Sequence, residues 1–301
     1  MNISALAALL MAAQAPQPAV PAADATKIKM TCPIGGSPFD YARPAASQAI
    51  GMRPDGKPYG PGQYPAALPE CPDNGLILYK DYAPAEVEKL TPLVASAEYQ
   101  ALRGTDTAYY RAYWLMKALG ESPDKYLWVL LQASWEAESR PALRDRYLSE
   151  FVEASAAIPA RPDDVEWIGM EGRAINALRE LGRFDEAKAR LAALPLASLE
   201  KPLGAAESGT EAGIRTARVR RTWINYFKSL GPLIDRKDKA VEPFEMIPGA
   251  VAVRLCAEKG DTLDPHQRAY CTAEGAAVEQ APGARPVSPS EAELLRQPRT
   301  R

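Results

Sequence analysis

Between residues 105 and 195, apolar side chains recur every three or four positions, the spacing of a helix with one face against a core. In the clearest case, 108–119, Tyr109, Tyr113 and Met116 share a face and Gly120 ends the pattern. The same spacing predicts further helices, one beginning at Pro123 and others over 142–156, 165–181 and 186–194. The centre of the chain is therefore predicted to be helical.

Proline and glycine set the expected limits of the flanking helices. A helix begins after Ala83 and is expected to break or restart at Thr91-Pro92, because proline lacks the backbone N–H that a helix interior uses. A later helix is expected to end at Gly231-Pro232 for the same reason. The helices predicted beyond the centre span 214–230, 250–257 and 265–278. The segment 198–213, rich in Gly, Ala and Ser, is predicted to be a linker.

The N-terminal part has a different pattern. Residues 27–31 alternate polar and apolar side chains, and 76–79 form a short apolar run, so both are predicted to be strands. Between them, Pro54-Asp55-Gly56 is a turn sequence. A small β unit is therefore expected before the helices.

The sequence from Leu181 to Ala187 predicts a tight helical hairpin, because one helix ends at Gly182 and the next begins within a few residues. This phrase resembles the tetratricopeptide repeat, with Phe184 at the turn and the small Ala187 at the contact between helices. The resemblance implies two or three irregular repeats. The predicted fold is mainly α, with tetratricopeptide-like hairpins behind a small disulfide-clamped β unit.

Two short motifs are similar in sequence: Cys32-Pro33-Ile34-Gly35-Gly36 and Cys71-Pro72-Asp73-Asn74-Gly75. The first follows the predicted strand 27–31, and the second precedes the predicted strand 76–79. They resemble the two metal-binding knuckles of a zinc ribbon, in which each knuckle supplies two thiolates. Here Gly35 and Asn74 occupy the second thiolate positions, so Cys32 and Cys71 remain as the only soft ligands. Facing knuckles would bring these two cysteines together as a disulfide; free thiols and a two-thiolate metal site are the alternatives.

Knuckles followed by tetratricopeptide-type helices, over about 30–195, resemble an uncharacterised bacterial family whose cytosolic members have complete knuckles. That resemblance implies no activity and supports no site residue.

The four cysteines form two pairs that are local in the sequence. Three connectivities are possible, and we favour Cys32 with Cys71 and Cys256 with Cys271, because each pair lies within one proline-rich unit. Disulfides persist in oxidising compartments. The cysteine count therefore agrees with export.

Residues 1–25 are predicted to be a signal peptide, since a short apolar run precedes two small-x-small cleavage sequences. That run is too short to span a bilayer, and no later segment has transmembrane character. The expected location is the periplasm or the exterior. The chain is then divided into a β unit over 26–82, a tetratricopeptide-like domain over 83–197, C-terminal helices with a second disulfide over 198–279, and a disordered tail over 280–301.

The charge balance argues against a polyanionic partner. Lys and Arg total 36 and Asp and Glu total 38, so the chain lacks the positive field that nucleic acids and anionic membranes attract. We therefore expect no nucleic-acid partner.

Candidate catalytic groups are few. The single histidine, His266, lies beside Asp264 in a capping sequence and has no evident partner for metal binding or base catalysis. Glu136 and Glu138 are two residues apart on a helix and do not face one another, and Asp163-Asp164 fits a helix cap. We expect no cofactor, no metal and no catalytic residue.

Partner binding is the favoured function, with a helical scaffold or adaptor whose concave surface binds a protein or peptide. The candidate residues for that contact are Trp114, Trp128, Trp135, Arg218 and Arg221. A solvated helix face and ordinary core packing are the simpler interpretations of these arginines and tryptophans. A periplasmic hydrolase acting on the cell envelope, and a redox partner using Cys32 and Cys71, are the alternative functions.

Overall fold

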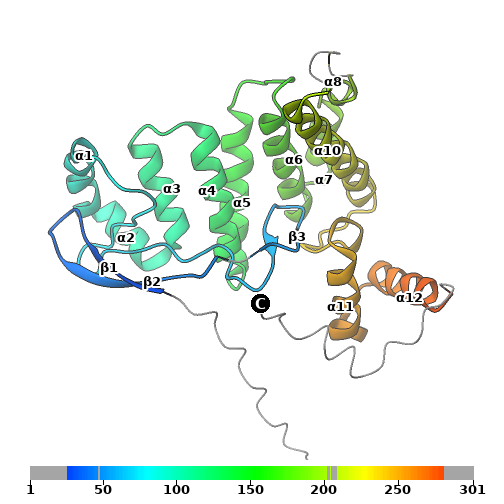
Figure 1. Cartoon of the computed structure of the whole chain (residues 1–301), viewed down its shortest axis with the longest axis horizontal. Helices are drawn as coiled ribbons and strands as arrows, with labels where there is room; N and C mark the ends of the chain where they lie inside the picture. Colours follow the sequence, from blue (N-terminus) through cyan, green and yellow to red (C-terminus); the bar gives the residue numbers. More distant parts are fainter. Residues whose placement is uncertain (1–25, 47, 202–203, 205–208, 281–301) are drawn as a thin grey trace, which may run out of the picture.

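The computed structural model describes residues 26–280, apart from 47, 202–203 and 205–208. The predicted signal peptide, 1–25, and residues 281–301 of the predicted tail lie outside the described residues. As predicted, the molecule is mainly helical, with a small N-terminal β unit that is clamped by a disulfide of its own. The helices α3 to α7 stand side by side as a row of hairpins (Figure 1).

Two helices precede the row, α1 Pro84–Ala95 and α2 Ala97–Thr105. The row itself consists of α3 Ala108–Ala118, α4 Pro123–Glu136, α5 Pro141–Ala156, α6 Val165–Glu180 and α7 Phe184–Ala192. Beyond them lie α8 Leu196–Glu200, α10 Glu211–Asp235, α11 Gly249–Lys259 and α12 Pro265–Gln280, with short 3₁₀ helices at Phe244–Met246 and Gly260–Thr262.

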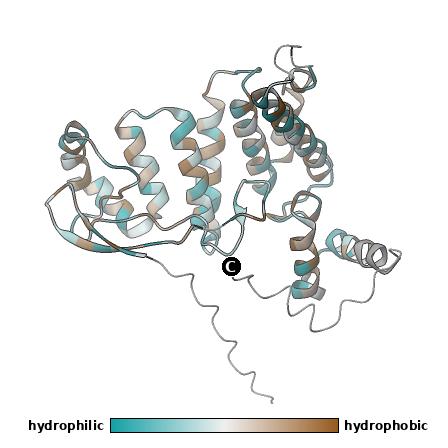
Figure 2. Ribbon diagram, in the orientation of Figure 1, coloured by the Kyte–Doolittle hydropathy of each residue, from teal (hydrophilic) through white to brown (hydrophobic). Residues whose placement is uncertain are grey.

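The main hydrophobic core lies between neighbouring helices of the row and includes the last turns of α10. Leu130 of α4, Phe151 of α5, Ile175 of α6 and Leu230 of α10 are fully buried there. Hydrophobic and hydrophilic positions alternate around these helices, as amphipathic packing requires (Figure 2). Glycines at 169 and 172 of α6 let aromatic side chains of α10 approach its backbone, because a Cβ at Gly169 would lie 2.5 Å from Trp223.

The hairpin between α6 and α7 packs as its sequence predicts. Gly182 ends α6 with φ +78°, a conformation that favours glycine. Ala187 is fully buried, and Phe184 and Leu191 pack against the main core.

Two predicted helix limits are wrong. Helix α1 continues through Pro92 to Ala95, and the break falls at Ser96, whose hydroxyl accepts a hydrogen bond from the Tyr99 N–H. Pro92 is exposed, so water can satisfy the carbonyl that its missing N–H leaves unbonded. Helix α10 likewise continues through Pro232, because the buried Leu233 draws its last turn into the core.

The predicted linker over 198–213 is wrong in part. Its first residues belong to α8, where Leu199 is buried in the main core, and its last residues form the first turn of α10. The Thr210 hydroxyl caps α10 by accepting a hydrogen bond from the Gly213 N–H.

The β unit consists of two antiparallel pairs. Strand β1 (Thr26–Thr31) pairs with β2 (Pro38–Arg43), and β3 (Gly51–Met52) pairs with β4 (Pro58–Tyr59). The prediction of β1 is confirmed, but the strand predicted over 76–79 is wrong, since only Ile77 forms a bridge, with Glu70. Leu76 and Ile77 are fully buried, so their apolar run reflects burial in the second core cluster and not sheet pairing.

The two knuckles have the same backbone hydrogen bonds. The N–H of Cys32 donates to the Ser37 carbonyl, and the Gly36 N–H donates back to Cys32. In the second knuckle, the Cys71 N–H donates to Leu76 and the Gly75 N–H donates to Cys71. The two loops therefore offer equivalent cysteine positions.

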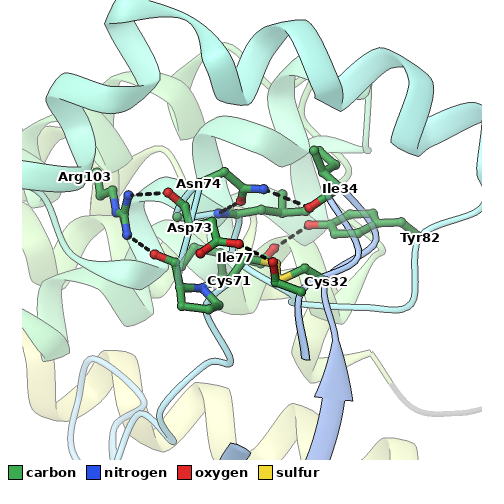
Figure 3. The surroundings of a disulfide bond; sticks show 12 residues. Cys32, Ile34, Cys71, Asp73, Asn74, Ile77, Tyr82 and Arg103 are labelled. Carbon is green, nitrogen blue, oxygen red and sulfur yellow. Dashed lines mark hydrogen bonds between the residues drawn. A yellow bond between two sulfur atoms is a disulfide. The ribbon is translucent and has the colours of Figure 1, made fainter. Parts of the chain in front are cut away.

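A disulfide joins the knuckles at those cysteines, Cys32 and Cys71, as predicted (Figure 3). Asn74, at the second thiolate position of its knuckle, donates to the Ile34 carbonyl of the other knuckle at 3.0 Å. A covalent bond and an amide hydrogen bond thus link the loops. The second predicted disulfide, Cys256–Cys271, is also present and joins α11 to α12.

Candidate functional site

The β3–β4 hairpin, residues 51–59, is inserted against the helical row, and we call it the inserted hairpin. Its turn residues Arg53, Pro54, Asp55 and Gly56 are buried. The Gly56 N–H donates to the Arg53 carbonyl at 2.9 Å, which closes the turn that the sequence predicts. Gly56 has φ +88°, which a side chain would strain.

Ion pairs fix the inserted hairpin to the start of the loop after α4. Glu138 forms ion pairs with Arg53 Nη1 at 2.5 Å and with Lys57 Nζ at 2.6 Å. Asp55 accepts from Arg53 Nε at 3.1 Å and from the Lys57 N–H at 3.0 Å. Burial lowers the pKa of Arg53, but the adjacent Asp55 and Glu138 outweigh burial and raise it overall.

Helix α10 recognises the backbone of the inserted hairpin. The Tyr226 hydroxyl donates to the Pro54 carbonyl at 2.9 Å and lies 3.2 Å from the Gly172 carbonyl of α6. Burial raises the pKa of Tyr226, so the phenol stays protonated and able to donate. Tyr59, at the end of the hairpin, donates to Glu242 at 2.8 Å.

Arg173 of α6 lies beneath Gly56, flanked by two tryptophans. Its Cζ is 5.1 Å from the ring centroid of Trp128 in α4 and 5.1 Å from that of Trp223 in α10. Nη1 donates to the Gly169 carbonyl at 3.0 Å, whereas Nε is buried without a partner. Within the described part of the chain no carboxylate forms an ion pair with Arg173. Burial lowers its pKa accordingly.

Neighbouring charged groups on α5 and α6 are paired. The buried Glu180 accepts hydrogen bonds from Arg144 and from Asn176, the latter at 2.7 Å, and Arg179 Nη2 lies 3.5 Å away. Burial raises the pKa of Glu180, and the Arg144 guanidinium opposes that rise. Arg173 therefore differs from the arginines around it.

We call the surface formed by Trp128, Glu138, Arg173, Trp223 and Tyr226 the hairpin-binding face. It holds a non-helical segment by ion pairs, one hydrogen bond to a backbone carbonyl, and aromatic contact. These are the means by which proteins hold extended peptides.

A separate hollow of about 610 Å³ lies between α5, α6 and α7. Trp167, Leu178 and Leu194 line it. Glu171 and Arg190 also line it and form an ion pair, with Arg190 Nη2 2.6 Å from Glu171 Oε1. Arg183 and Glu186, which also line the hollow, form a second ion pair, so both arginines of the hollow are paired with a carboxylate.

The structure brings together only two of the five predicted partner-binding residues. Trp128 and Trp135 lie with ring centroids 5.5 Å apart, and Trp135 is buried. Trp114 lies on α3, and Arg218 and Arg221 are exposed on α10.

Trp114 packs in the second core cluster, away from these two tryptophans. Its ring centroid is 5.6 Å from that of Tyr99, and its Nε1 donates to Glu98 at 3.1 Å.

The carboxylates considered for catalysis have structural partners. Glu136 accepts from the Tyr109 N–H at 2.9 Å, and Asp164 caps α6 by accepting from the Glu166 N–H at 2.9 Å. His266 Nε2 contacts Glu245, while Asp264 accepts from the His266 N–H. Among residues 26–280 with the gaps given above, no group of three His, Cys, Asp or Glu side chains is placed to hold a metal.

Sequence reasoning missed Arg173 and the pairing of Arg53 with Glu138. The inserted hairpin and α6 are far apart in sequence, so no local spacing links them. The one available signal was the glycine pair at 169 and 172, which marks a close approach to a helix.

No protein-family model, no curated protein and no solved structure matches this chain. Within the described helices, none is both long enough and apolar enough to cross a bilayer.

Proposed function

We propose that the protein is an exported helical scaffold that binds a protein or peptide partner at its hairpin-binding face and performs no catalysis of its own. One observation carries the proposal: this face already holds an irregular segment, the inserted hairpin, through its backbone and its charges. A surface suited to an internal peptide segment has the groups that a second peptide would use.

The helical arrangement supports a repeat scaffold. The α6–α7 hairpin has a glycine of positive φ at Gly182 and a fully buried Ala187 where the two helices meet. We infer a tetratricopeptide-like array from these features, in which each hairpin buries its apolar face against the next.

The two disulfides support export. Disulfides persist in oxidising compartments and are rare in the cytosol. The equivalent backbone bonds of the two knuckles support a zinc-ribbon origin, in which the Cys32–Cys71 bond replaces the metal.

Site-specific photo-crosslinking in the native host tests the proposal. A photoreactive residue at Met52, exposed on the inserted hairpin, should give a discrete crosslinked species. The same residue at Ala189, in the α5–α7 hollow, and at Lys89, exposed on α1, should not. The proposal would be contradicted if Lys89 gave as much crosslinked product as Met52, or if Met52 gave none.

A further inference from the structure

Arg173 has more hydrogen-bond donors than the structure uses. A guanidinium carries five N–H groups, and the described residues supply one acceptor, the Gly169 carbonyl. Nε is buried and unbonded. An unpaired buried donor costs free energy. A surface that keeps such a donor is therefore expected to pair it with an acceptor of a ligand.

Two nitrogens that carry unused donors, Nε and Nη2, form one edge of the guanidinium, and this edge lies beneath the inserted hairpin. A Cβ at Gly56 would lie 2.9 Å from Nε and 3.4 Å from Nη2 of Arg173. Gly56 thus covers the edge that carries both atoms, without supplying an acceptor to it. Parallel donors on this edge match the two oxygens of a carboxylate.

We propose that Arg173, flanked by Trp128 and Trp223, is the binding site for a carboxylate of the peptide partner, and that the ligand displaces Gly56 from the guanidinium edge. The carboxylate belongs to an acidic side chain or to a C-terminus. This inference rests on the proposed function and names the chemistry of the partner.

The surroundings favour a carboxylate over a phosphate dianion. Burial lowers the pKa of Arg173, and the nearby Tyr226 and Asp55 only partly oppose that lowering; Glu138 and Glu180 are near the same hairpin. These negative charges repel a dianion more strongly than a single carboxylate. The two indoles keep water from the guanidinium, which strengthens a charged pair formed there.

Displacement has a definite cost, because the inserted hairpin is held by Glu138 and Tyr226. Weakening that hold without changing Arg173 should therefore tighten ligand binding. Glu138→Gln does so, since it removes the ion pairs with Arg53 and Lys57.

Short peptides and the Nε–Hε NMR signal of Arg173 provide the test. The probes are acetyl-Ala-Ala-Glu-Ala-amide, acetyl-Ala-Ala-Ala with a free carboxylate, the matched peptide with Gln for Glu, and inorganic phosphate. Saturable shifts with either carboxylate peptide support the proposal, and the two peptides distinguish side-chain from terminal carboxylates. No saturable shift with either, or an equal shift with the Gln peptide or phosphate, overturns it.

Variants locate the binding. Arg173→Lys keeps the charge but loses the paired donors, so affinity measured by tryptophan fluorescence should fall about tenfold. Arg173→Met should abolish binding, whereas Arg215→Gln, which changes an exposed arginine of α10, should leave binding as in the unchanged protein. Thermal unfolding checks that each variant is folded. If Arg173→Met does not fold, Arg173→Lys alone tests the site. Full affinity in Arg173→Lys overturns the proposal.

Glu138→Gln tests the displacement step, with about threefold tighter binding expected. Unchanged or weaker binding would contradict it. If photo-crosslinking at Met52 succeeds while the carboxylate peptides fail, the scaffold proposal stands and the Arg173 site is wrong.

Discussion

The two disulfides differ in the length of chain that they enclose and in what that chain contacts. Cys32–Cys71 is buried in the second core cluster and spans a separation of 39 residues, which includes the whole inserted hairpin. Cys256–Cys271 is half-buried, spans 15 residues and joins only α11 to α12. One bond thus helps to place a segment on the hairpin-binding face, and the other fixes a peripheral helical pair.

This difference suggests that a disulfide matters most where the enclosed chain makes its own contacts far from the bond. The residues between Cys32 and Cys71 reach α4 through Glu138 and α10 through Tyr226. Reopening that loop would raise the entropy of the unfolded chain and also loosen the attachment of the inserted hairpin.

The largest expected effect follows replacement of both Cys32 and Cys71 by serine. The chain-entropy model gives a loss of roughly 4 kcal/mol for this loop. Urea denaturation measures that loss. Hydrogen exchange should also increase at the N–H groups of Arg53 and Gly56, because the inserted hairpin loses its covalent tether.

An unchanged urea midpoint would contradict this prediction. Unchanged exchange at Arg53 and Gly56, with lowered global stability, would show that the hairpin is held by the helices alone.

The disulfide pairing could be predicted because each pair is local in the sequence and each cysteine of the first pair lies in a recognisable loop. The helical centre was equally accessible, since Tyr113, Ala187 and other buried residues follow the helical period. The helix limits at Pro92 and Pro232 could not be predicted from the sequence. Burial elsewhere in the helix and access of water to the free carbonyl decide whether a proline ends a helix.

A smaller effect is expected from Gly56→Ala, which alters the inserted hairpin at its contact with Arg173. The methyl group meets Nε at 2.9 Å and a backbone with φ +88°, so about 1–3 kcal/mol of stability should be lost. Tryptophan fluorescence of Trp128 should change as the hairpin shifts. Urea denaturation gives the magnitude.

Gly249→Ala is a control that has neither the close contact nor the positive φ of Gly56, because Gly249 opens α11 and a Cβ there meets nothing within 4 Å. Its stability should change by less than about 0.5 kcal/mol. Equal losses in the two variants would mean that neither the contact with Arg173 nor the positive φ at Gly56 determines the loss of stability.

The candidate site could not be predicted from the sequence, for a physical reason. Pro54-Asp55-Gly56 indicated a turn, but nothing in its composition states which surface buries it. The sequence does not show that Arg173 has no carboxylate partner. This is visible only in the structure, where Trp128, Trp223 and Gly56 surround the guanidinium. Long-range pairing of charges depends on the packed structure, whereas helical period depends only on the order of residues.

The smallest effect on the main fold is expected when serine replaces both Cys256 and Cys271. The chain-entropy model gives roughly 3 kcal/mol for this loop, but that free energy belongs to the α11–α12 pair. Val251 and Leu255 of this pair pack with Phe244 in a third core cluster, separate from the main core, which Tyr59 of the inserted hairpin also contacts. Hydrogen exchange should therefore increase in α12, while the urea midpoint reported by the five tryptophans, all of which lie outside α11 and α12, stays within error. A midpoint shift as large as that of the Cys32 and Cys71 variant would show that the peripheral pair supports the row of hairpins, and that enclosure of the inserted hairpin is not what distinguishes the two bonds.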